Sequence, residues 1–373
     1  MSPPPSDRVA TSAVEWAGRF HSQAAACDEL GSPLYGRLMR LLAEDCRAEG
    51  STWSVLRPHA ALRFGQAGPL RLVGTAHRLA LVGRAPSWAA CLPSCGGVVP
   101  DDDAELSDAW AALVAEHPVE LDAGLAREVQ TNEVGRAAAL AYGTLLAGLP
   151  DGVRLVELGC SGGLNLRHDR YEVRLGSLRL GPPDSPVRLR PEVRGFADPG
   201  VDPDVGDDAR SAGVPSQGAV VERIGLDPHP VDVTDSEGLA TLLSFVWPDQ
   251  PERIARVRAA ASVAAEVPAD LRAVVDTADA LSEVLAAPAA PTLVQHSIVW
   301  QYIPVDQRWR ITETLEEAGR RATAAAPLAW LRYEPDEWGR TRAALWLRRW
   351  PGGGDRLLAH ADFHGRWISP VPA

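Results

Sequence analysis

The stretch Arg154-Leu155-Val156-Glu157-Leu158-Gly159-Cys160-Ser161-Gly162-Gly163-Leu164-Asn165-Leu166 decides the expected fold of this chain. Its first half is an apolar run, which is typical of a strand covered on both faces of a parallel sheet. Three glycines follow, and glycine adopts the positive φ of a tight turn and lets a ligand approach the backbone closely. The stretch therefore predicts a buried strand, a glycine turn and the start of a helix.

An acidic residue, Glu157, stands near the end of the expected strand. A helix that begins after the turn points its free N–H groups and the positive end of its dipole at whatever occupies the turn. A carboxylate there can accept from a hydroxyl group or pair with a cation. The combination favours a nucleotide-like ligand that carries positive charge. The alternative is a tight strand-to-helix turn that binds nothing.

The composition excludes several functions. The chain has 373 residues and a formal net charge of −12, and all 37 of its basic residues are arginine. Without lysine, a Schiff-base enzyme, a P-loop enzyme and a kinase-type site are impossible. The acidic balance argues against nucleic acid as a partner. No apolar run is long enough to span a bilayer, so we expect no membrane partner. The oligomeric state is not indicated.

The cysteines are five in number and scattered. Together with the absence of an apolar leader segment, this predicts a reducing, cytoplasmic environment. Cys91 and Cys95 form a pair with no second Cys or His pair nearby, so we expect no metal site.

Two domains are expected. Residues 1–148 read as a helical lid domain and residues 149–373 as an α/β domain with an insertion at 171–218. In the first, a helix is predicted over 125–146, and its polar run 130–136 could overhang the glycine turn. Short strands are possible near 71–73. In the second, strands alternate with helices, which is the α/β pattern. The expected strands are 154–158, 220–226, 271–275, 292–296 and 328–333, followed by a hairpin at 342–348 and 357–361.

The spacing Glu-x-Gly-x-Ser-x-Gly from Glu157 to Gly163 resembles the first motif of class I S-adenosylmethionine-dependent methyltransferases. Ser161 stands where that motif has a second glycine. Five strand–helix units followed by a hairpin also resemble the Rossmann-like, seven-stranded sheet of those enzymes. Open α/β sheets bind ligands at the carboxyl ends of their strands.

The whole chain is also similar to a mainly actinobacterial, uncharacterised family called domain of unknown function 2332. The segments that carry this similarity are Gln130–Glu133, Glu157–Asn165, Arg223–Asp227, Val246–Gln250 and His364–Trp367. The similarity to this family names no reaction.

The methyltransferase resemblance implies S-adenosylmethionine as the cofactor and O- or N-methylation of a small molecule or peptide. The cofactor contacts expected are Glu157, Gly159, Ser161, Gly163, Asn165, Asp227 and Asp279. In this set the glycine turn lies by the methionine and ribose part, Asp227 accepts from the ribose hydroxyls, and Asp279 meets the adenine amino group. Asp276 remains a competitor of Asp279. Asn165 is included because the chain has only one other asparagine, Asn132, and both lie in motif-like segments.

Three residues are candidates for the catalytic step. An oxygen or nitrogen acceptor loses a proton when it is methylated, so a base helps. His296 is the best candidate because it ends the expected fourth strand; the alternative is a hydrogen-bonded core histidine. Tyr302 could orient the acceptor or simply pack, and His364, near the terminal hairpin, could close the acceptor pocket.

Two other functions stay open. Gly159-Cys160-Ser161-Gly162-Gly163 also matches Gly-x-Ser-x-Gly, the nucleophile turn of α/β-hydrolases. Ser161 would then be the nucleophile, with Asp276 or Asp279 and with His360 or His364 as partners. The third possibility is a cofactor-binding scaffold without catalysis.

Overall fold

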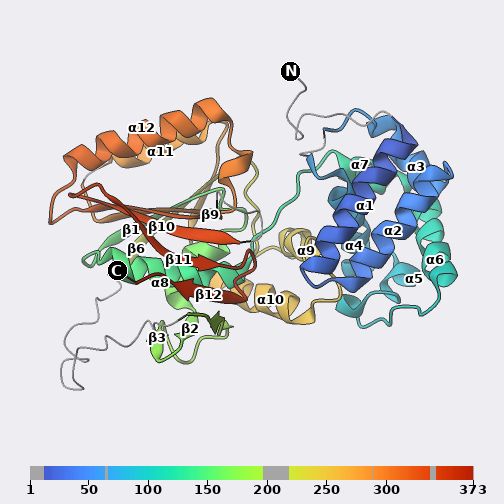
Figure 1. The fold of residues 1–373 in the computed structure, drawn as a ribbon, viewed down its shortest axis with the longest axis horizontal. Coiled ribbons are helices and arrows are strands. Elements are labelled where there is room, and N and C mark those ends of the chain that lie inside the picture. The colour runs from blue at the N-terminus through green and yellow to red at the C-terminus, as the bar shows by residue number, and fades with distance from the viewer. Residues whose placement is uncertain (1–11, 64–65, 196–217, 288, 337–341, 373) are drawn as a thin grey trace. The chain divides into compact units, whose positions relative to one another are not determined.

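The structure is a computed structural model, and it describes residues 12–63, 66–195, 218–287, 289–336 and 342–372. The chain divides into two compact units (Figure 1). The first unit combines Met1–Thr131 with Ser236–Ala255, and the second combines Asn132–Asp235 with Arg256–Ala373. The expected boundary at residue 148 therefore differs from the observed one, and a segment of the expected α/β domain belongs to the helical unit.

The first unit is helical. Its described helices are α1 (Ala13–Glu29), α2 (Pro33–Arg47), α3 (Ser51–Leu56), α4 (Gly68–Leu81), α5 (Pro86–Ala89), α6 (Asp103–Glu116), α7 (Pro118–Leu125), α9 (Ser236–Ser244) and the start of α10 (Pro251–Glu266), with short 3-10 turns η2 (Arg57–His59) and η4 (Pro93–Cys95). The strand expected near 71–73 is wrong, because α4 covers it. Leu72, Ala76 and Leu79 recur at helical spacing and are buried in one core, as expected for an amphipathic helix.

Residues 236–255 join the first unit through specific contacts. Trp247 lies in the helical core. The Asp249 carboxylate accepts from Ser32 Oγ at 2.6 Å and from Leu34 N at 2.9 Å, so it caps the start of α2. An acid at this place satisfies free N–H groups and complements the helix dipole. These contacts explain why this segment leaves the α/β unit.

The second unit is built on a nine-stranded sheet in the order β5-β12-β11-β10-β9-β8-β1-β6-β7. The strands are β1 (Val153–Leu158), β5 (Glu192–Val193), β6 (Val220–Asp227), β7 (Asp270–Ala273), β8 (Thr292–Ser297), β9 (Leu328–Pro335), β10 (Ala343–Trp350), β11 (Asp355–Ala361) and β12 (Trp367–Pro370). Neighbours from β7 to β9 are parallel, neighbours from β9 to β12 are antiparallel, and β5 is parallel to β12. The sheet is thus large, mixed and mostly parallel.

The described residues form a main sheet of nine strands, where seven were expected. The predicted hairpin is present as β10 and β11, but it continues the sheet in chain order from β9 and is followed by β12. β5 comes from the expected insertion and adds a further edge strand. The rest of that insertion includes β2 (Glu172–Leu175), β3 (Leu178–Leu180) and β4 (Arg188–Leu189), which form a separate small sheet. Residues 196–217 of the predicted insertion lie outside the described residues.

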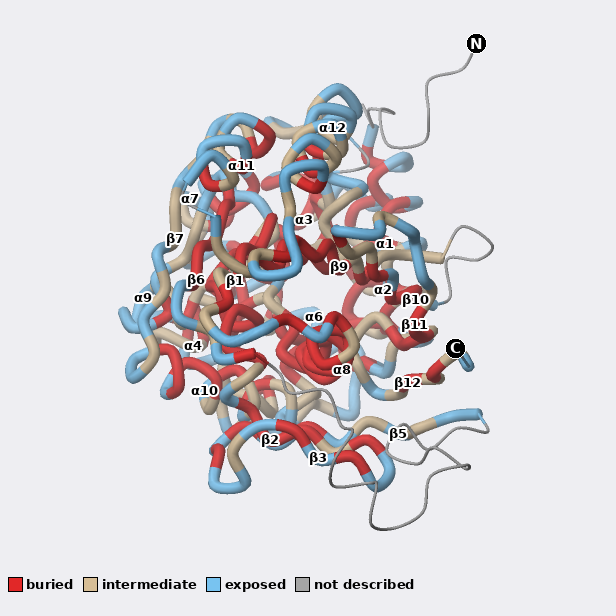
Figure 2. Tube along the Cα trace, turned by 90° about the vertical axis from the view of Figure 1, so that its left-hand side faces the viewer, coloured by how far each residue is buried: buried red, intermediate tan, exposed pale blue. Residues whose placement is uncertain are grey.

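Helices cover both faces of the main sheet (Figure 1). On one face, α11 (Thr277–Ala286) and α12 (Val305–Arg321) share a core with Val156, Ile224 and Val294. On the other face, α8 (Ala137–Ala147) packs so closely that a Cβ on Gly143 would lie 2.4 Å from a Leu331 methyl group. Figure 2 shows α8 and the central strands as buried. Burial on both faces explains the nearly continuous apolar sequence of β1.

Two predicted helices differ from the structure around the motif segments. The expected helix over 125–146 is α-helical only from Ala137, after the 3-10 turn η5 (Val134–Arg136). The preceding residues Asn132 and Glu133 are not helical, because they form hydrogen bonds with Leu164 and Asn165. The helix expected after the glycine turn is a 3-10 helix, η6 (Leu164–Arg170).

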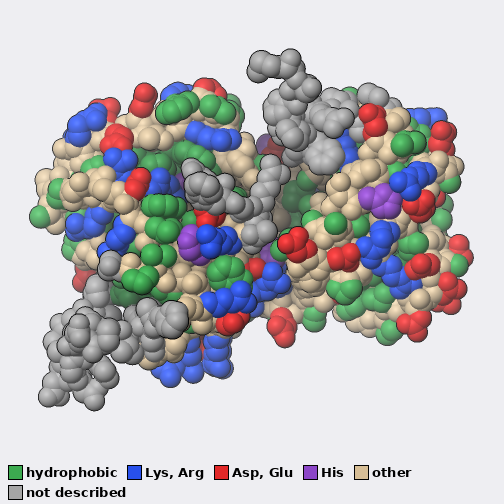
Figure 3. Space-filling view, viewed as in Figure 1, with side chains coloured by type: hydrophobic (Ala, Val, Ile, Leu, Met, Phe, Trp, Pro, Cys, Tyr) green, Lys and Arg blue, Asp and Glu red, His purple; other side chains and the backbone are tan. Residues whose placement is uncertain are grey.

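No helix in the described ranges combines the length and apolar character needed to cross a membrane. All five cysteines are free. Acidic and arginine side chains are interspersed over much of the face drawn in Figure 3.

Candidate functional site

The glycine turn after β1 is tightly constrained. Gly159, Ser161 and Gly163 all have positive φ, of +66°, +50° and +63°. A Cβ on Gly159 would lie 2.2 Å from Val299 Cγ2. The segment that follows β8 therefore leaves room only for glycine at position 159. Ser161 holds the left-handed conformation without being glycine, which is uncommon and carries strain.

Asp227, at the end of β6, closes this turn. One of its carboxyl oxygens accepts from Ser161 N at 2.8 Å, and the other accepts from His229 N at 2.8 Å. The carboxylate is 7% exposed. Two backbone donors leave part of its acceptor capacity for a ligand hydroxyl, because a carboxylate has about four lone-pair sites.

Glu157 is buried without a partner for one carboxyl oxygen. The residue is 1% exposed, and its Oε2 has no hydrogen-bond partner among the described residues. Burial raises the pKa of Glu157 to about 8, and nearby Asp227 adds to this rise, whereas Arg167 and Arg136 oppose it. Near neutral pH this carboxyl group is therefore mainly protonated until a cation or donor approaches it.

Two further buried acceptors lie beside Glu157. Gln295 is its register neighbour on β8. The Gln295 Nε2 group donates to Asn165 O at 3.3 Å, which links the two residues. Gln295 Oε1 and Asn165 Oδ1 are both buried without a donor among the described residues. Buried polar atoms are nearly always hydrogen-bonded. Three buried oxygens without a described partner, on residues linked through the β1–β8 register and the Gln295–Asn165 bond, are therefore candidate ligand contacts.

The predicted overhang of the polar run is confirmed. Asn132 Oδ1 accepts from Leu164 N at 2.8 Å, and Asn165 Nδ2 donates to Glu133 O at 3.4 Å. Both asparagines of the chain therefore join the segment before α8 to the glycine turn. These bonds also explain why residues 132 and 133 do not continue a helix, since their polar groups are used across the fold.

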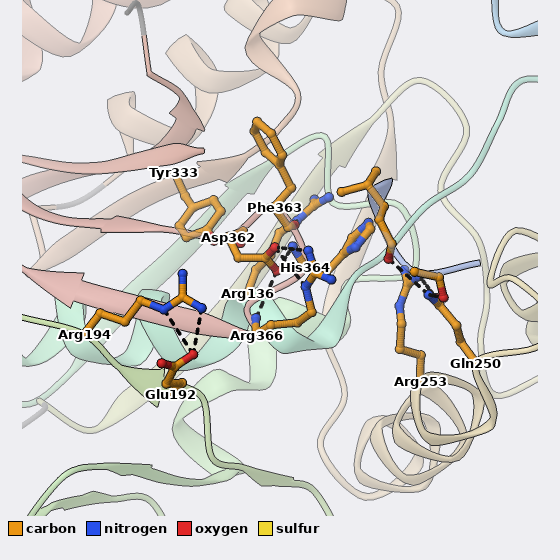
Figure 4. Close-up of polar contacts among 12 residues, drawn as sticks. Arg136, Glu192, Arg194, Gln250, Arg253, Tyr333, Asp362, Phe363, His364 and Arg366 are labelled. Atoms are coloured by element: carbon orange, nitrogen blue, oxygen red, sulfur yellow. Dashed lines mark hydrogen bonds and ion pairs between the residues drawn. The ribbon is translucent and has the colours of Figure 1, made fainter. Parts of the chain in front are cut away.

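Arg136 connects the segment before α8 to the β11–β12 turn and to the end of β8. Its Nε donates to Phe363 O at 2.9 Å and its Nη1 donates to Ser297 O at 3.2 Å. Figure 4 shows the guanidinium group at the turn between β11 and β12. A Cβ on Gly135 would lie 2.1 Å from His364 O, and one on Gly365 would lie 2.2 Å from Gly135 O. The two backbones meet at this point because both residues are glycine.

The turn from Asp362 to Arg366 contains the predicted residue His364. Asp362 is 4% exposed and accepts from the backbone of His364 and from both the backbone and guanidinium of Arg366. Tyr333 Oη donates to Asp362 O. The turn is thus fixed at the same edge as the ends of β8 and β9. Sequence reasoning did not identify Asp362, although its position three residues before Gly365 is typical of a side-chain-closed turn.

His296 is fully buried and held in one orientation. Its Nδ1 lies 2.7 Å from Glu334 Oε1, and the same oxygen accepts from Val299 N and Trp300 N. The Trp300 ring stacks on the imidazole at 4.9 Å between centroids and 14° between planes. His296 Nε2 has no described partner. Sequence reasoning missed Glu334, which could have been noticed as the acid near the end of the fifth expected strand.

A second strained residue follows His296. Ile298 has a φ of +53°, and this conformation is a true outlier for a β-branched residue. The strained residues Ser161 and Ile298 therefore lie just after two neighbouring strands, β1 and β8. Strain of this kind is concentrated at functional sites.

The remaining predicted residues are not part of this cluster. Tyr302, in η7 (Trp300–Tyr302), is 67% exposed. Asp276 caps α11 and accepts from Arg310 Nη1 at 2.7 Å, and Asp279 pairs with the same arginine. Both carboxylates are therefore already engaged by a cation. Neither has the unsatisfied, buried character of Glu157.

Across the described residues, no group of three or more His, Cys, Asp or Glu side chains could hold a metal ion. Glu157 Oε2, Gln295 Oε1 and Asn165 Oδ1 are the buried acceptors that a donor-bearing ligand would use. Asp227 bonds to the same glycine turn.

Residues 17–369 match the family model described as "Uncharacterized protein conserved in bacteria (DUF2332)". Because the match spans nearly the whole chain, the protein belongs to this family. No curated protein and no solved structure matches the chain.

Proposed function

We propose that this member of the DUF2332 family is an S-adenosylmethionine-dependent methyltransferase that acts on a small molecule or peptide. The observation that carries the proposal is the buried carboxyl group of Glu157, one oxygen of which has no partner, at the end of the first sheet strand and beside a glycine turn. A ligand bearing positive charge satisfies this group and makes its ionisation favourable.

The order of the central strands supports the same proposal. In chain order, the five parallel strands β1, β6, β7, β8 and β9 are first to fifth, and they lie in the spatial order third, second, first, fourth, fifth. This is the order of doubly wound, nucleotide-binding α/β sheets, the wider class to which the proposed enzyme type belongs. The order reverses next to β1, and ligands of open α/β sheets bind at that switch point.

The chain's residues fit the cofactor in part. The ammonium and hydroxyl groups of S-adenosylmethionine are donors that match the three unsatisfied oxygens of Glu157, Gln295 and Asn165. Gly159 and Gly163 supply the positive φ that the turn requires, and the space beside them is taken by Val299 and Leu271. Asp227 retains acceptor capacity for ribose. The adenine contact proposed for Asp279 is the weakest part of the fit, because Arg310 already neutralises that side chain.

When bound, S-adenosylmethionine would supply its methyl group to an acceptor oxygen or nitrogen, with the methyl–sulfur bond broken and S-adenosylhomocysteine as the leaving group. The protein's task is to align the acceptor and to take up its proton, and alignment can contribute roughly 7–11 kcal/mol. His296 would receive this proton at Nε2. Glu334, hydrogen-bonded to Nδ1, would stabilise the imidazolium that results. Tyr302 and His364 stay predicted contributors to the acceptor side.

The test is calorimetric titration of the purified protein with S-adenosylhomocysteine. We expect saturable one-to-one binding that Glu157→Gln weakens by at least tenfold, because a buried charge-assisted contact is lost. The matched control is Glu222→Gln on the neighbouring strand β6, where the exposed carboxylate pairs with Arg154. This control should bind as the wild type does.

Absence of saturable binding, or equal binding by the wild type and Glu157→Gln, would contradict the proposal. A second readout is available for the cationic cofactor. Since the pKa of Glu157 is about 8, binding S-adenosylmethionine near pH 7 should release close to one proton, which appears as a dependence of the binding heat on the buffer's ionisation enthalpy.

One observation favours the hydrolase alternative, namely the positive φ of Ser161. Three of its four expected partners lie beside other side chains, because Asp276 and Asp279 pair with Arg310 and His360 Nδ1 lies 3.4 Å from Asp336 Oδ2; the fourth is His364. Labelling of Ser161 by a fluorophosphonate probe, with no binding of S-adenosylhomocysteine, would favour the hydrolase.

A further inference from the structure

The small sheet of β2, β3 and β4 has two unlike faces. Side chains alternate along each strand, so one face collects Val173, Leu175, Leu178, Leu180 and Leu189, all buried. The other face collects arginines, namely Arg174, Arg179 and Arg188, with Arg190 two residues beyond Arg188. In Figure 3 arginine side chains gather where Figure 1 draws β2 and β3.

A single carboxylate organises three of these arginines. Glu172 Oε1 accepts from Arg174 Nε at 2.7 Å, and Glu172 Oε2 lies 3.5 Å from Arg188 Nε and 3.8 Å from Arg190 Nη2. The Glu172 side chain is 6% exposed, whereas those of Arg188 and Arg190 are 60% and 54% exposed. The acid is covered, and the guanidinium groups cluster above it with most of their surface open.

The fourth arginine increases the excess of positive charge. Arg179 is exposed on β3 and stands directly opposite Arg174 in the register of the two strands. Like charges in such a cross-strand pair destabilise a sheet. Four arginines and one carboxylate therefore lie together on a face that covers only a few residues of each strand, and three of the arginines reach the carboxylate.

This local excess is opposite in sign to the whole chain, whose formal net charge is −12. Guanidinium groups match the geometry of phosphate oxygens and form two hydrogen bonds to them at once. Three guanidinium groups that reach one carboxylate form a compact cluster, which suits a short run of anions better than an extended polymer. An extended polymer would need a row of cations along its length.

We propose that this arginine face binds a ligand with a short chain of phosphoryl groups, such as inorganic tripolyphosphate or the triphosphate of a nucleotide. Glu172 is a positioning residue that holds the guanidinium groups together. The proposal is independent of the methyltransferase proposal, because it uses none of the same residues.

The test is titration of the full chain with sodium tripolyphosphate at low salt and without divalent metal. We expect one-to-one binding that weakens as salt is added. The double variant Arg188→Gln with Arg190→Gln should weaken it by at least tenfold. The control, Arg320→Gln with Arg321→Gln, makes the same charge change at the exposed end of α12 and should bind as the wild type does.

A second variant guards against misfolding. Arg179→Gln changes an exposed side chain on another strand and removes the like-charge pair with Arg174. It should weaken binding several-fold while the thermal unfolding temperature does not fall. Titration with ATP then identifies the source: equal affinity means that the phosphoryl chain alone is recognised, and higher affinity means that the nucleoside adds contacts.

Three results would overturn the proposal. The first is no tripolyphosphate binding at low salt. The second is binding that the arginine-face variants leave unchanged, or that the control pair weakens equally. The third is tight binding of a single-stranded oligonucleotide by a chain that does not bind tripolyphosphate, since the face would then select a nucleic acid.

Discussion

At the scale of single residues, Glu157 combines burial with an unsatisfied oxygen, and its ionisation is therefore linked to stability. Its pKa is about 8 in the folded chain and 4.5 for the unperturbed group. Between these two values the folded state binds more protons than the unfolded state. The free energy of unfolding should therefore fall as pH rises through this window, and level off above it.

We expect Glu157→Gln to remove this dependence, because glutamine has nearly the same shape and stays neutral. From about pH 5 to pH 8, the stability of the wild type should decrease by about 1.4 kcal/mol per pH unit relative to the variant. Urea unfolding at several pH values measures the difference. Glu222→Gln is the control and should follow the wild type, and parallel curves for wild type and Glu157→Gln would show that Glu157 ionises normally.

His296 and Glu334 show how a residue's role depends on its neighbours. The histidine was expected from its position at the end of a strand. Its acid partner comes from β9, the next strand in the sheet. Its stacking partner Trp300 begins η7, two residues after the strained Ile298. The pair fixes which ring nitrogen faces the carboxylate, which is the geometry that a general base requires.

At the scale of elements, the close contact between the segment before α8 and the β11–β12 turn holds one edge of the site. Gly135 and Gly365 meet backbone to backbone there, and Arg136 bonds across the same junction. A side chain at either glycine would separate the two elements. The contact therefore couples the position of His364 to that of the glycine turn after β1.

We expect Gly365→Ala to destabilise the fold by about 3 kcal/mol or more, because the new Cβ would be strained at a φ of +71° and would also strike Gly135 O. Gly148→Ala is the matched control. Its φ is +57°, but no atom lies within 4 Å of the new Cβ. It should cost only about 1–2 kcal/mol. Chemical denaturation compares the two, and equal losses would mean that the close contact contributes nothing.

At the scale of the whole molecule, the chain passes from the helical unit to the α/β unit and back before it finishes the sheet. Residues 236–255 stand in the α/β part of the sequence but are fixed in the helical unit by Trp247 and Asp249. Neither unit is made from one continuous stretch. A substitution in residues 236–255 should therefore lower the stability of the first unit.

We expect Asp249→Ala to cost about 1 kcal/mol, the usual effect of removing a helix cap. Amide hydrogen exchange should become faster in α2 of the helical unit, while the amides of β1 and β8 keep their protection. Glu252→Ala, at the exposed start of α10, is the control. Faster exchange in β1 and β8 alone would contradict the assignment of this segment to the helical unit.

Much of the second unit could be predicted from sequence, because buried strands are recognisable as apolar stretches. All five parallel strands were expected within three residues of their observed ends. β1, β6, β8 and β9 each contain a run of buried residues, whereas β7 is exposed or half-buried throughout. The glycine turn could also be predicted, because the positive φ at Gly159 and Gly163 favours glycine. The approach of Asn132 to this turn followed from its place before the first strand.

The tertiary structure alone decided the rest. No local pattern marks Glu334 as the partner of His296, or Gly365 as the neighbour of Gly135, because each pair is joined only when distant strands align at one edge of the sheet. The same holds for Asp249, whose partners lie more than two hundred positions earlier in the chain. Local sequence determines which stretches form strands, helices and turns through burial and backbone freedom. Which side chains meet depends on long-range packing, and that is set by the sheet order and by the helices laid against it.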